Sequence, residues 1–340
     1  MAKLKVGLMG YGFMGKAHAA CYCASKKGEV VAIWDANPAL LDPKAQAGGN
    51  LPTGPLTLDW KKLKTYTDRD AKKFFADPDI DMVDICLPTP MHMKFVRAAA
   101  KAGKHILSEK PICLNSKEAE ETLKIVRKAG VKWMVAQCVR FWPEYDFLKK
   151  IVDSKKLGKL ITLSLRRVAA TPGWGQKNWI LKGKLSGGAL FDLSVHDTDY
   201  AYYLLGMPKK VRAAGRKDLV TGAYDVIYAQ LIYDKPVVNI ESQWVMTNGF
   251  QMYYLATFEK GVVEFDCAKP KDALTLTEGA KVSHPKMQAT TGWNLEIEYF
   301  LDCVQKGKDP KLCMPESSIA SLKIAEAEVK AANTGKTVRP

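Results

Sequence analysis

The pattern of hydrophobic positions changes character part-way along the chain. Up to about residue 137, short apolar runs rich in β-branched residues alternate with segments whose apolar residues recur at helical spacing. From about residue 158 the apolar runs are longer, and several of them are joined in pairs by turn residues. The pattern predicts two domains, at 1–137 and 138–340.

The first region predicts a parallel sheet. Strands that are apolar on both faces and alternate with amphipathic helices are typical of a parallel sheet covered on both sides. The Gly- and Pro-rich segment 42–64 breaks this rhythm, so we expect it to be a loop inserted after the second strand. We expect strands at 4–9, 30–34, 82–86, 105–107 and 132–136, and helices at 13–25, 71–76, 94–102 and 116–128.

The second region predicts an antiparallel sheet. The turn signals Asp234-Lys235-Pro236 and Glu259-Lys260-Gly261 each join two apolar runs, as in β-hairpins. The fold class is therefore an α/β domain followed by an α+β domain. We expect strands at 161–167, 224–233, 237–245, 252–258 and 262–267, and helices that end near Leu205 and span about 294–306 and 315–333.

The charge of the chain is high, but it is spread out. The 340 residues carry a net charge of +15, with 47% hydrophobic and 26% charged residues, which is ordinary for a globular protein. Lysine pairs such as Lys61-Lys62 and Lys209-Lys210 are scattered, and no basic arm stands out. A solvated lysine-rich surface explains this pattern, although a field that attracts anionic ligands stays open. No nucleic-acid partner is expected.

Cysteine usage and hydropathy suggest the compartment. None of the eight cysteines forms a C-x-x-C pair, and most lie in apolar runs, so we interpret them as buried thiols in a reducing environment. The N-terminus leads directly into a strand, without a signal peptide, and no apolar run is long enough for a membrane span. We expect a cytoplasmic enzyme with no membrane partner and no metal site.

A glycine-rich loop follows the first expected strand. Gly10, Gly12 and Gly15 form a G-x-G-x-x-G motif, with Phe13 and Met14 between the last two glycines. The first glycine permits a tight turn, the second lets a pyrophosphate approach the backbone, and the third lets helix and strand pack closely. These five residues are candidate cofactor contacts at a helix N-terminus that favours phosphate.

An acid ends the second expected strand. Asp35 can accept hydrogen bonds from the ribose hydroxyls of an adenosine, and its carboxylate would repel a 2′-phosphate. No Arg or Lys follows at once, because the next residues are Ala36-Asn37-Pro38. The sequence therefore favours NAD over NADP. A dinucleotide fold without a ligand is the alternative.

A lysine follows the expected strand at 105–107. Glu109-Lys110-Pro111 places Lys110 at the carboxyl end of a parallel strand, where doubly wound folds bind their ligands. A cation there could stabilise negative charge that develops on a substrate oxygen. The alternative is a surface lysine in a loop.

A polar pair lies on the helix that ends near Leu205. Asp192 and His196 are separated by four residues, so they share one face of the helix. A histidine beside a carboxylate can move a hydroxyl proton. The alternative is an exposed polar stripe, with Asp192 favoured by the helix dipole.

Together these segments resemble the Gfo/Idh/MocA oxidoreductase family over nearly the whole chain. The resemblance rests on the ordered set of Gly10–Gly15, Leu87–His92, Ala102–Pro111, Arg140–Pro143, Gly187–Asp199, Glu298–Cys303 and Gly335–Val338. It implies a Rossmann domain, followed by a domain with a large, mostly antiparallel open sheet that commonly pairs with another subunit in a homodimer or homotetramer.

The resemblance also implies roles for particular residues. Lys110 would lie near nicotinamide and substrate, with Glu109 beside it, and Asp192 and His196 would complete the catalytic set. Pro88, Thr89 and His92 belong to a loop that borders the cofactor in the family. The string His196-Asp197-Thr198-Asp199 resembles that of inositol dehydrogenases.

We therefore expect NAD-dependent oxidation of a secondary alcohol on a sugar or cyclitol, with His196 taking the proton and Lys110 polarising the oxygen. Only one of Arg166 and Arg167 can face the site, because neighbours on a strand point to opposite faces. Arg167 and Trp174 are candidate substrate contacts, and a loop anchor is the alternative for Trp174. Two other classes stay open: a glycoside-processing enzyme that recycles NAD, and an NAD-binding regulator without turnover.

Overall fold

The computed structural model describes residues 2–44, 49, 54–68, 71–173, 176–269 and 271–340. These residues form two compact units. The first comprises 1–138 and 292–319, and the second comprises 139–291 and 320–340. The segment 292–319 thus belongs with the N-terminal unit, although it follows the second sheet in the sequence.

The first unit is built on a six-stranded parallel sheet with the strand order β3-β2-β1-β4-β5-β6. The alternation of strand and helix predicted from the sequence is confirmed, and the core strands are almost fully buried. The strands are β1 (Leu4–Met9), β2 (Gly28–Trp34), β3 (Lys64–Tyr66), β4 (Met82–Ile85), β5 (His105–Glu109) and β6 (Trp133–Ala136). The helices are α1 (Phe13–Ala24), α2 (Lys72–Ala76), α3 (His92–Lys101), α4 (Ser116–Ala129) and α8 (Gly292–Gln305).

The sequence missed β3. Its three residues pair in parallel with β2 at the end of the segment expected to be a loop. Two of them are exposed and one is half-buried, so no hydrophobic alternation marks the strand. A short 3₁₀ turn, η1 (Pro38–Leu41), precedes the segment 42–64, and the described residues of this segment before Lys64 form no helix or strand.

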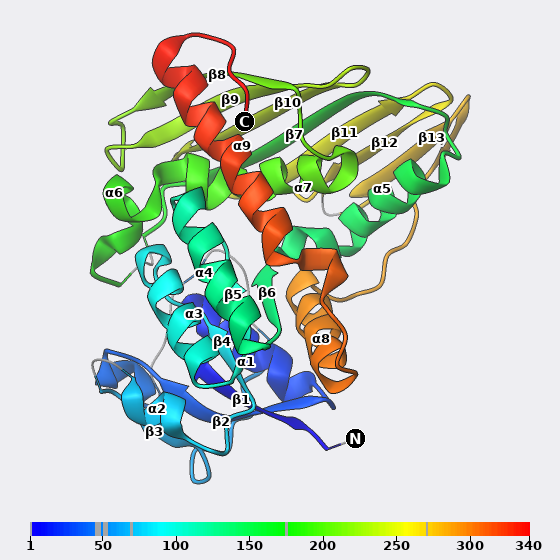
Figure 1. Ribbon diagram of the computed structural model, residues 1–340. Helices are drawn as coiled ribbons and strands as arrows, with labels where there is room; N and C mark the ends of the chain where they lie inside the picture. The colour runs from blue at the N-terminus through cyan, green and yellow to red at the C-terminus, as the bar shows by residue number, and fades with distance from the viewer. Residues whose placement is uncertain (1, 45–48, 50–53, 69–70, 174–175, 270) are drawn as a thin grey trace. The chain divides into compact units, whose positions relative to one another are not determined.

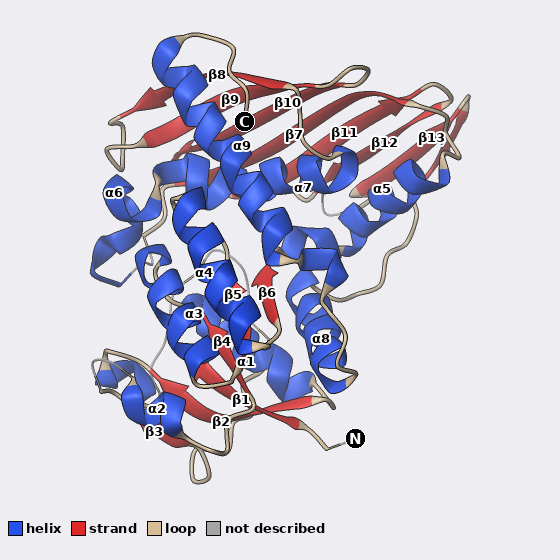
Figure 2. Cartoon of the chain, in the orientation of Figure 1, coloured by secondary structure: helices blue, strands red, loops and turns tan. Residues whose placement is uncertain are grey.

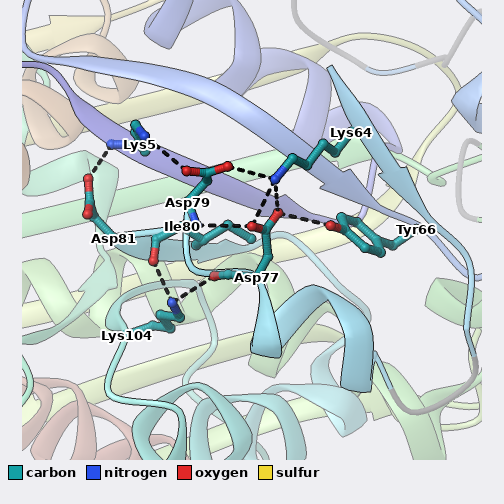
Figure 3. A network of polar contacts seen from close by, with 8 residues as sticks. All are labelled: Lys5, Lys64, Tyr66, Asp77, Asp79, Ile80, Asp81 and Lys104. Carbon is teal, nitrogen blue, oxygen red and sulfur yellow. Dashed lines mark hydrogen bonds and ion pairs between the residues drawn. The ribbon is translucent and has the colours of Figure 1, made fainter. Parts of the chain in front are cut away.

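A polar network ties together the amino ends of the parallel strands (Figure 3). The Lys64 ammonium reaches both Asp77 and Asp79, at 3.0 and 2.8 Å, and the Tyr66 hydroxyl donates to Asp77 at 2.9 Å. Lys104, which precedes β5, donates to the backbone carbonyls of Asp77 and Ile80. This network stabilises the edge of the sheet opposite to the one where its strands end.

The second unit contains an eight-stranded sheet with the order β14-β13-β12-β11-β7-β10-β9-β8. Only β7 and β10 are parallel, and every other neighbouring pair is antiparallel. The predicted mostly antiparallel sheet and both predicted hairpins are confirmed. The strands are β7 (Leu160–Ala170), β8 (Lys210–Lys217), β9 (Tyr224–Ile232), β10 (Val237–Met246), β11 (Phe250–Phe258), β12 (Gly261–Asp266), β13 (Leu274–Glu278) and β14 (Lys281–Ser283).

Helices cover one face of this sheet, as Figure 1 and Figure 2 show. They are α5 (Pro143–Ser154), α6 (Gly183–Ser186), α7 (Val195–Leu205) and the C-terminal helix α9 (Pro315–Thr334). No helix of the described residues covers the other face, and exposed side chains such as Tyr228, Val237 and Val245 lie there on strands β9 and β10. The sequence did not predict α5, β8, β13 or β14.

One expected helix is irregular. The segment that precedes α7 is a π-helical turn, η5 (Leu190–Ser194), and the regular α-helix begins only at Val195. Asp192 therefore lies in the π turn and His196 in the α-helix. Such turns widen the backbone locally and are frequent at functional sites.

Within the described ranges, every helix is too short or too polar to cross a lipid bilayer.

Candidate functional site

The glycine loop lies where the motif requires it, between β1 and α1. Gly10 follows the last residue of β1, and Gly12 is the N-cap of α1. No acidic residue lies in the first turn of α1, so the positive end of the helix dipole is left for an anionic ligand.

Each of the three glycines meets a different steric constraint. Gly10 has φ +93°, and a Cβ there would lie 2.5 Å from the carbonyl oxygen of Cys86. A Cβ at Gly15 would lie 1.9 Å from the carbonyl oxygen of Gly10, so only glycine allows α1 to approach β1 this closely. A Cβ at Gly12 would have no atom within 4 Å. The first and third glycines thus fit the turn and the packing, and the second borders the open space that a pyrophosphate needs.

Asp35 directly follows β2 and lies close to this loop. Its carboxylate accepts hydrogen bonds from the backbone N–H groups of Tyr11 and Asn37, both at 2.8 Å. Burial raises the pKa of Asp35, and these two hydrogen bonds oppose the shift. In dinucleotide-binding folds, an acid at this position accepts hydrogen bonds from the ribose hydroxyls of the adenosine.

Lys110 directly follows β5, which extends to Glu109 and is two residues longer than expected. The Lys110 side chain is half-buried, and its peptide bond to Pro111 is cis. Since β1, β4 and β5 are adjacent parallel strands, Gly10, Cys86 and Lys110 all leave the sheet at the same edge. In open α/β sheets this edge is the one that binds ligands.

Two side chains expected to contact the cofactor have other partners. The His92 ring is fully buried and lies 2.9 Å from the carbonyl oxygen of Pro111 and 2.7 Å from that of Leu87. Burial lowers the pKa of His92, and these backbone contacts oppose the shift. The His92 ring thus holds the 87–92 loop against the loop after β5, and a contact of His92 with the cofactor stays a prediction.

The Glu109 side chain is also buried within the first unit. Its carboxylate accepts a hydrogen bond from the Lys110 backbone N–H at 2.9 Å. Of the neighbouring candidates, Thr89 is buried, whereas Pro88, Phe13 and Met14 are half-buried and remain accessible.

Asp192 and His196 share the accessibility that their spacing predicts. Both side chains are half-buried, whereas residues 193–195 and 197–199 are buried. Leu193 anchors the π turn in an apolar cluster with Ala169, Ile180, Ala189 and Trp244. The backbone on either side of the pair is therefore held, and the pair itself stays within reach of solvent.

Buried ion pairs fix α7 behind His196. The Arg167 guanidinium, 3% exposed, contacts Asp197 at 2.9 Å and the Tyr145 hydroxyl at 3.2 Å. Arg140 contacts Asp199 at 2.6 Å. Leaving one partner of such a pair buried alone is strongly unfavourable, so each pair specifies the orientation of the helix.

These contacts give Arg167 a structural partner. Its guanidinium is buried against Asp197, and its role as a substrate contact stays a prediction. The prediction that Arg166 and Arg167 point to opposite faces agrees with their surroundings, because Arg166 pairs with Glu241 at 3.2 Å on the face without helices. Trp174 lies outside the described residues.

The predicted site residues thus fall into two groups. Lys110, the glycine loop and Asp35 belong to the first unit, and Asp192 and His196 belong to the second. Each group is ordered within its own unit by buried contacts.

The chain belongs to the Gfo/Idh/MocA oxidoreductase family. The family model described as "Oxidoreductase family, NAD-binding Rossmann fold" matches residues 4–137. The model of the family's C-terminal domain matches residues 145–264. The first unit is accordingly an NAD-binding Rossmann domain, and the geometry of its three glycines fits that cofactor.

Curated relatives cover the chain to different extents. It is 28% identical to an inositol 2-dehydrogenase from Rhizobium meliloti over 96% of both chains. It is 33% identical to a levoglucosan dehydrogenase from Pseudarthrobacter phenanthrenivorans over 63% of this chain and 54% of that protein. A solved levoglucosan dehydrogenase in complex with NADH and levoglucosan has the same fold, with a TM-score of 0.84 at 22% identity over 99% of both chains.

The glycine loop generates a matched pair of variants. Gly12→Ala should leave the thermal unfolding midpoint near that of the wild type, because φ at Gly12 is −75° and its Cβ would meet open space. The same variant should bind NAD much more weakly in calorimetric titrations. Gly15→Ala should instead lower the free energy of unfolding by about 1–3 kcal/mol through overpacking. Wild-type NAD affinity in Gly12→Ala would contradict the assignment of the loop.

A buried acid behind α7 predicts a pH dependence of stability. Glu328 is fully buried and accepts a hydrogen bond from the Thr198 hydroxyl at 2.9 Å. Burial, with a smaller effect of the Asp197 charge, raises the pKa of Glu328 from 4.5 to about 8, against the opposing effect of that hydrogen bond. Between these two values the folded protein binds more protons at this site than the unfolded chain. The Glu328 contribution to the free energy of unfolding therefore falls as the pH rises from 4.5 to 8.

Glu328→Gln keeps the acceptor for Thr198 and removes the titration. We expect it to match the wild type in stability near pH 5 and to exceed it at pH 8 by on the order of 1–3 kcal/mol. Urea unfolding at both pH values measures the difference. An equal offset at both would show that Glu328 does not titrate in this range.

Proposed function

We propose that the protein catalyses reversible, NAD-dependent oxidation of a secondary alcohol on a cyclic polyol, either a cyclitol or a sugar. The observation that carries the proposal is the position of Lys110 at the carboxyl end of β5. That edge of the sheet is the one at which the glycine loop leaves β1.

The proposed chemistry divides between three side chains. When bound, nicotinamide supplies the hydride acceptor or donor. The Lys110 ammonium stabilises negative charge that develops on the substrate oxygen. His196 takes the hydroxyl proton during oxidation and returns it during reduction, and Asp192 orients His196 or binds a neighbouring hydroxyl.

Asp35 supports NAD as the cofactor in preference to NADP. Its carboxylate is held by the Tyr11 and Asn37 N–H groups at the end of β2, so it cannot swing aside without losing two hydrogen bonds. A fixed negative charge there would repel a ribose 2′-phosphate. The residues that follow, Ala36-Asn37-Pro38, offer no cation to bind one.

The names of the relatives support the substrate class. Inositol 2-dehydrogenase and levoglucosan dehydrogenase both name ring compounds that carry secondary alcohols. The half-buried Asp192 and His196 provide the polar pair that a polyol with several hydroxyl groups would need.

We further propose that the chain forms a homodimer or homotetramer through the second sheet. Tyr228, Val237 and Val245 are 52%, 47% and 38% exposed on strands β9 and β10 of the face that carries no helix. A second copy of the same face would cover them.

All eight cysteines are free, which supports a reducing, cytoplasmic location.

A substrate screen distinguishes this function from the alternatives. Inositols, aldoses, amino sugars and glycosides are offered with NAD, and both NADH absorbance and aglycone release are measured. NADH formation with a cyclitol or sugar supports the proposal. Aglycone release without net NADH would instead indicate a glycoside-processing enzyme, and NAD binding without either product would indicate a regulator.

Lys110→Met removes the ammonium and keeps a side chain of similar length. Turnover should fall about 100-fold or more, as when a donor to a developing oxyanion is lost. NADH affinity, measured by fluorescence titration, should change little.

Lys104→Met is the matched control, because it makes the same change at the opposite end of β5. Among the described residues, its ammonium donates to the backbone carbonyls of Asp77 and Ile80 (Figure 3). It should lose stability and keep turnover at temperatures where it is folded. Undiminished turnover in Lys110→Met would remove Lys110 from the mechanism.

A further inference from the structure

A cluster of ionisable side chains is buried in the first unit next to Lys110. His18, on α1, is fully buried between two carboxylates. Its Nδ1 lies 2.8 Å from an oxygen of Asp84 on β4, and its Nε2 lies 3.2 Å from an oxygen of Glu109 at the end of β5. None of the sequence motifs marks His18, because its partners lie 66 and 91 positions away in the chain.

The two neighbouring carboxylates favour a charged His18. A carboxylate oxygen only accepts hydrogen bonds, so a ring that faces one at each nitrogen is best satisfied when both nitrogens carry a proton. Burial alone would lower the pKa of His18, but the charge and hydrogen bond of Asp84, with a smaller effect of Cys86, raise it well above its ordinary value. His18 is therefore an imidazolium at neutral pH.

The charge of Glu109 follows from this imidazolium. Burial would raise the pKa of Glu109, but the contact with His18 and the nearby Lys110 charge outweigh burial and lower it. One Glu109 oxygen faces His18, and the other accepts the backbone N–H of Lys110 at 2.9 Å. The carboxylate thus connects the imidazolium to the residue from which the Lys110 side chain departs.

A second glutamate in the cluster has a different state. Glu296, on α8, is fully buried, and neither carboxyl oxygen has a hydrogen-bond partner among the residues that the structure describes. Burial first, and then the Glu109 and Asp84 charges, raise the pKa of Glu296 well above its ordinary value, against the effect of His18. Glu296 is therefore neutral and does not compete with Glu109 for the imidazolium.

The same cluster has the composition of a metal site, but its imidazole and its thiol are not in the states that bind a metal. The ligand atoms of His18, Asp84 and Cys86 lie within 4.8 Å of one another. Burial, followed by the Asp84 charge, raises the pKa of the Cys86 thiol, and a metal needs the thiolate. The Tyr22 hydroxyl also donates to the Asp84 oxygen that faces His18, at 2.9 Å, and the Cys86 thiol donates to the other Asp84 oxygen at 3.5 Å.

We propose that His18 is a positioning residue for the reaction, which holds the Glu109 carboxylate so that Glu109 in turn fixes the backbone from which Lys110 reaches its substrate. This inference rests on the proposed function, since it assigns Lys110 to the chemistry. It requires that His18 act through Glu109 and not merely through the stability of the sheet.

Two substitutions at His18 separate these roles. The amide of His18→Gln can reach the Nε2 position and keep a donor to Glu109, whereas the amide of His18→Asn can reach only the Nδ1 position beside Asp84. Breaking a buried ion pair is strongly destabilising, so thermal unfolding is measured first and kinetics are recorded where each variant is folded. We expect kcat to fall about 100-fold in His18→Asn, as for a displaced catalytic group, with little change in NADH affinity. His18→Gln should recover much of that loss.

Two glutamate variants complete the design. Glu109→Gln should lower kcat as His18→Asn does, and the double variant should lower it no further, because both act on one path. Glu296→Gln is the matched control from the same cluster and should keep the wild-type kcat, since Glu296 is already neutral. Equal kcat losses in both His18 variants that follow the losses in thermal stability would overturn the proposal. A stoichiometric metal in the purified protein would also overturn it.

A readout that needs no turnover keeps this inference separate from the proposed function. Lysines are reductively methylated with ¹³C, and the Lys110 signal is assigned in NMR spectra by its absence from Lys110→Met. His18→Asn and Glu109→Gln should each shift this signal, and Glu296→Gln should not. If the signal shifts but no polyol is oxidised, the proposed function fails, whereas the connection from His18 through Glu109 to Lys110 is supported. If polyols are oxidised but the signal does not move, the connection fails.

Discussion

The close approach of α1 to the end of β1 is the constraint on which the first unit depends. At Gly15 there is no room for a side chain, because the carbonyl oxygen of Gly10 occupies the place of its Cβ. This approach aligns the N-terminus of α1 with the phosphate space beside Gly12. It also sets where the next turn of the helix lies, and that turn carries His18 to Asp84 and Glu109.

Buried charge plays a similar part in both units. In the first, an imidazolium lies between two carboxylates next to Lys110. In the second, Arg140 and Arg167 hold Asp199 and Asp197 behind the half-buried His196. A buried ion pair adds little net stability compared with apolar packing, but it penalises every arrangement that separates the partners. In each unit, the predicted site residues thus lie beside interactions that favour specificity over stability.

Much of the fold could be predicted from the sequence because local patterns determine it. Continuous apolar runs that alternate with amphipathic helices predicted the parallel sheet. Turn residues between paired apolar runs predicted the hairpins of the second sheet. β3 was not predicted because its three residues show no alternation of hydrophobic and polar positions. The π turn at Leu190–Ser194 was not predicted because helical spacing of apolar residues does not distinguish a π turn from an α turn.

Within the site, the glycine loop, Asp35 and Lys110 were found because each follows a strand, where ligands bind in such sheets. The partners of His92, Arg167 and His18 could not be found in this way. They are brought together by tertiary packing across 19, 30 and 91 positions of the chain, and no periodicity encodes such a pairing.

The central claim is that this chain transfers a hydride between a polyol carbon and NAD. The most direct measurement offers NAD with cyclitols and sugars that carry deuterium on the carbinol carbons and examines the reduced cofactor by mass spectrometry. The account predicts one deuterium in each reduced nicotinamide formed, and slower turnover than with the unlabelled polyol. Reduced cofactor that never acquires deuterium, or NAD that binds and is not reduced by any of these compounds, would contradict it.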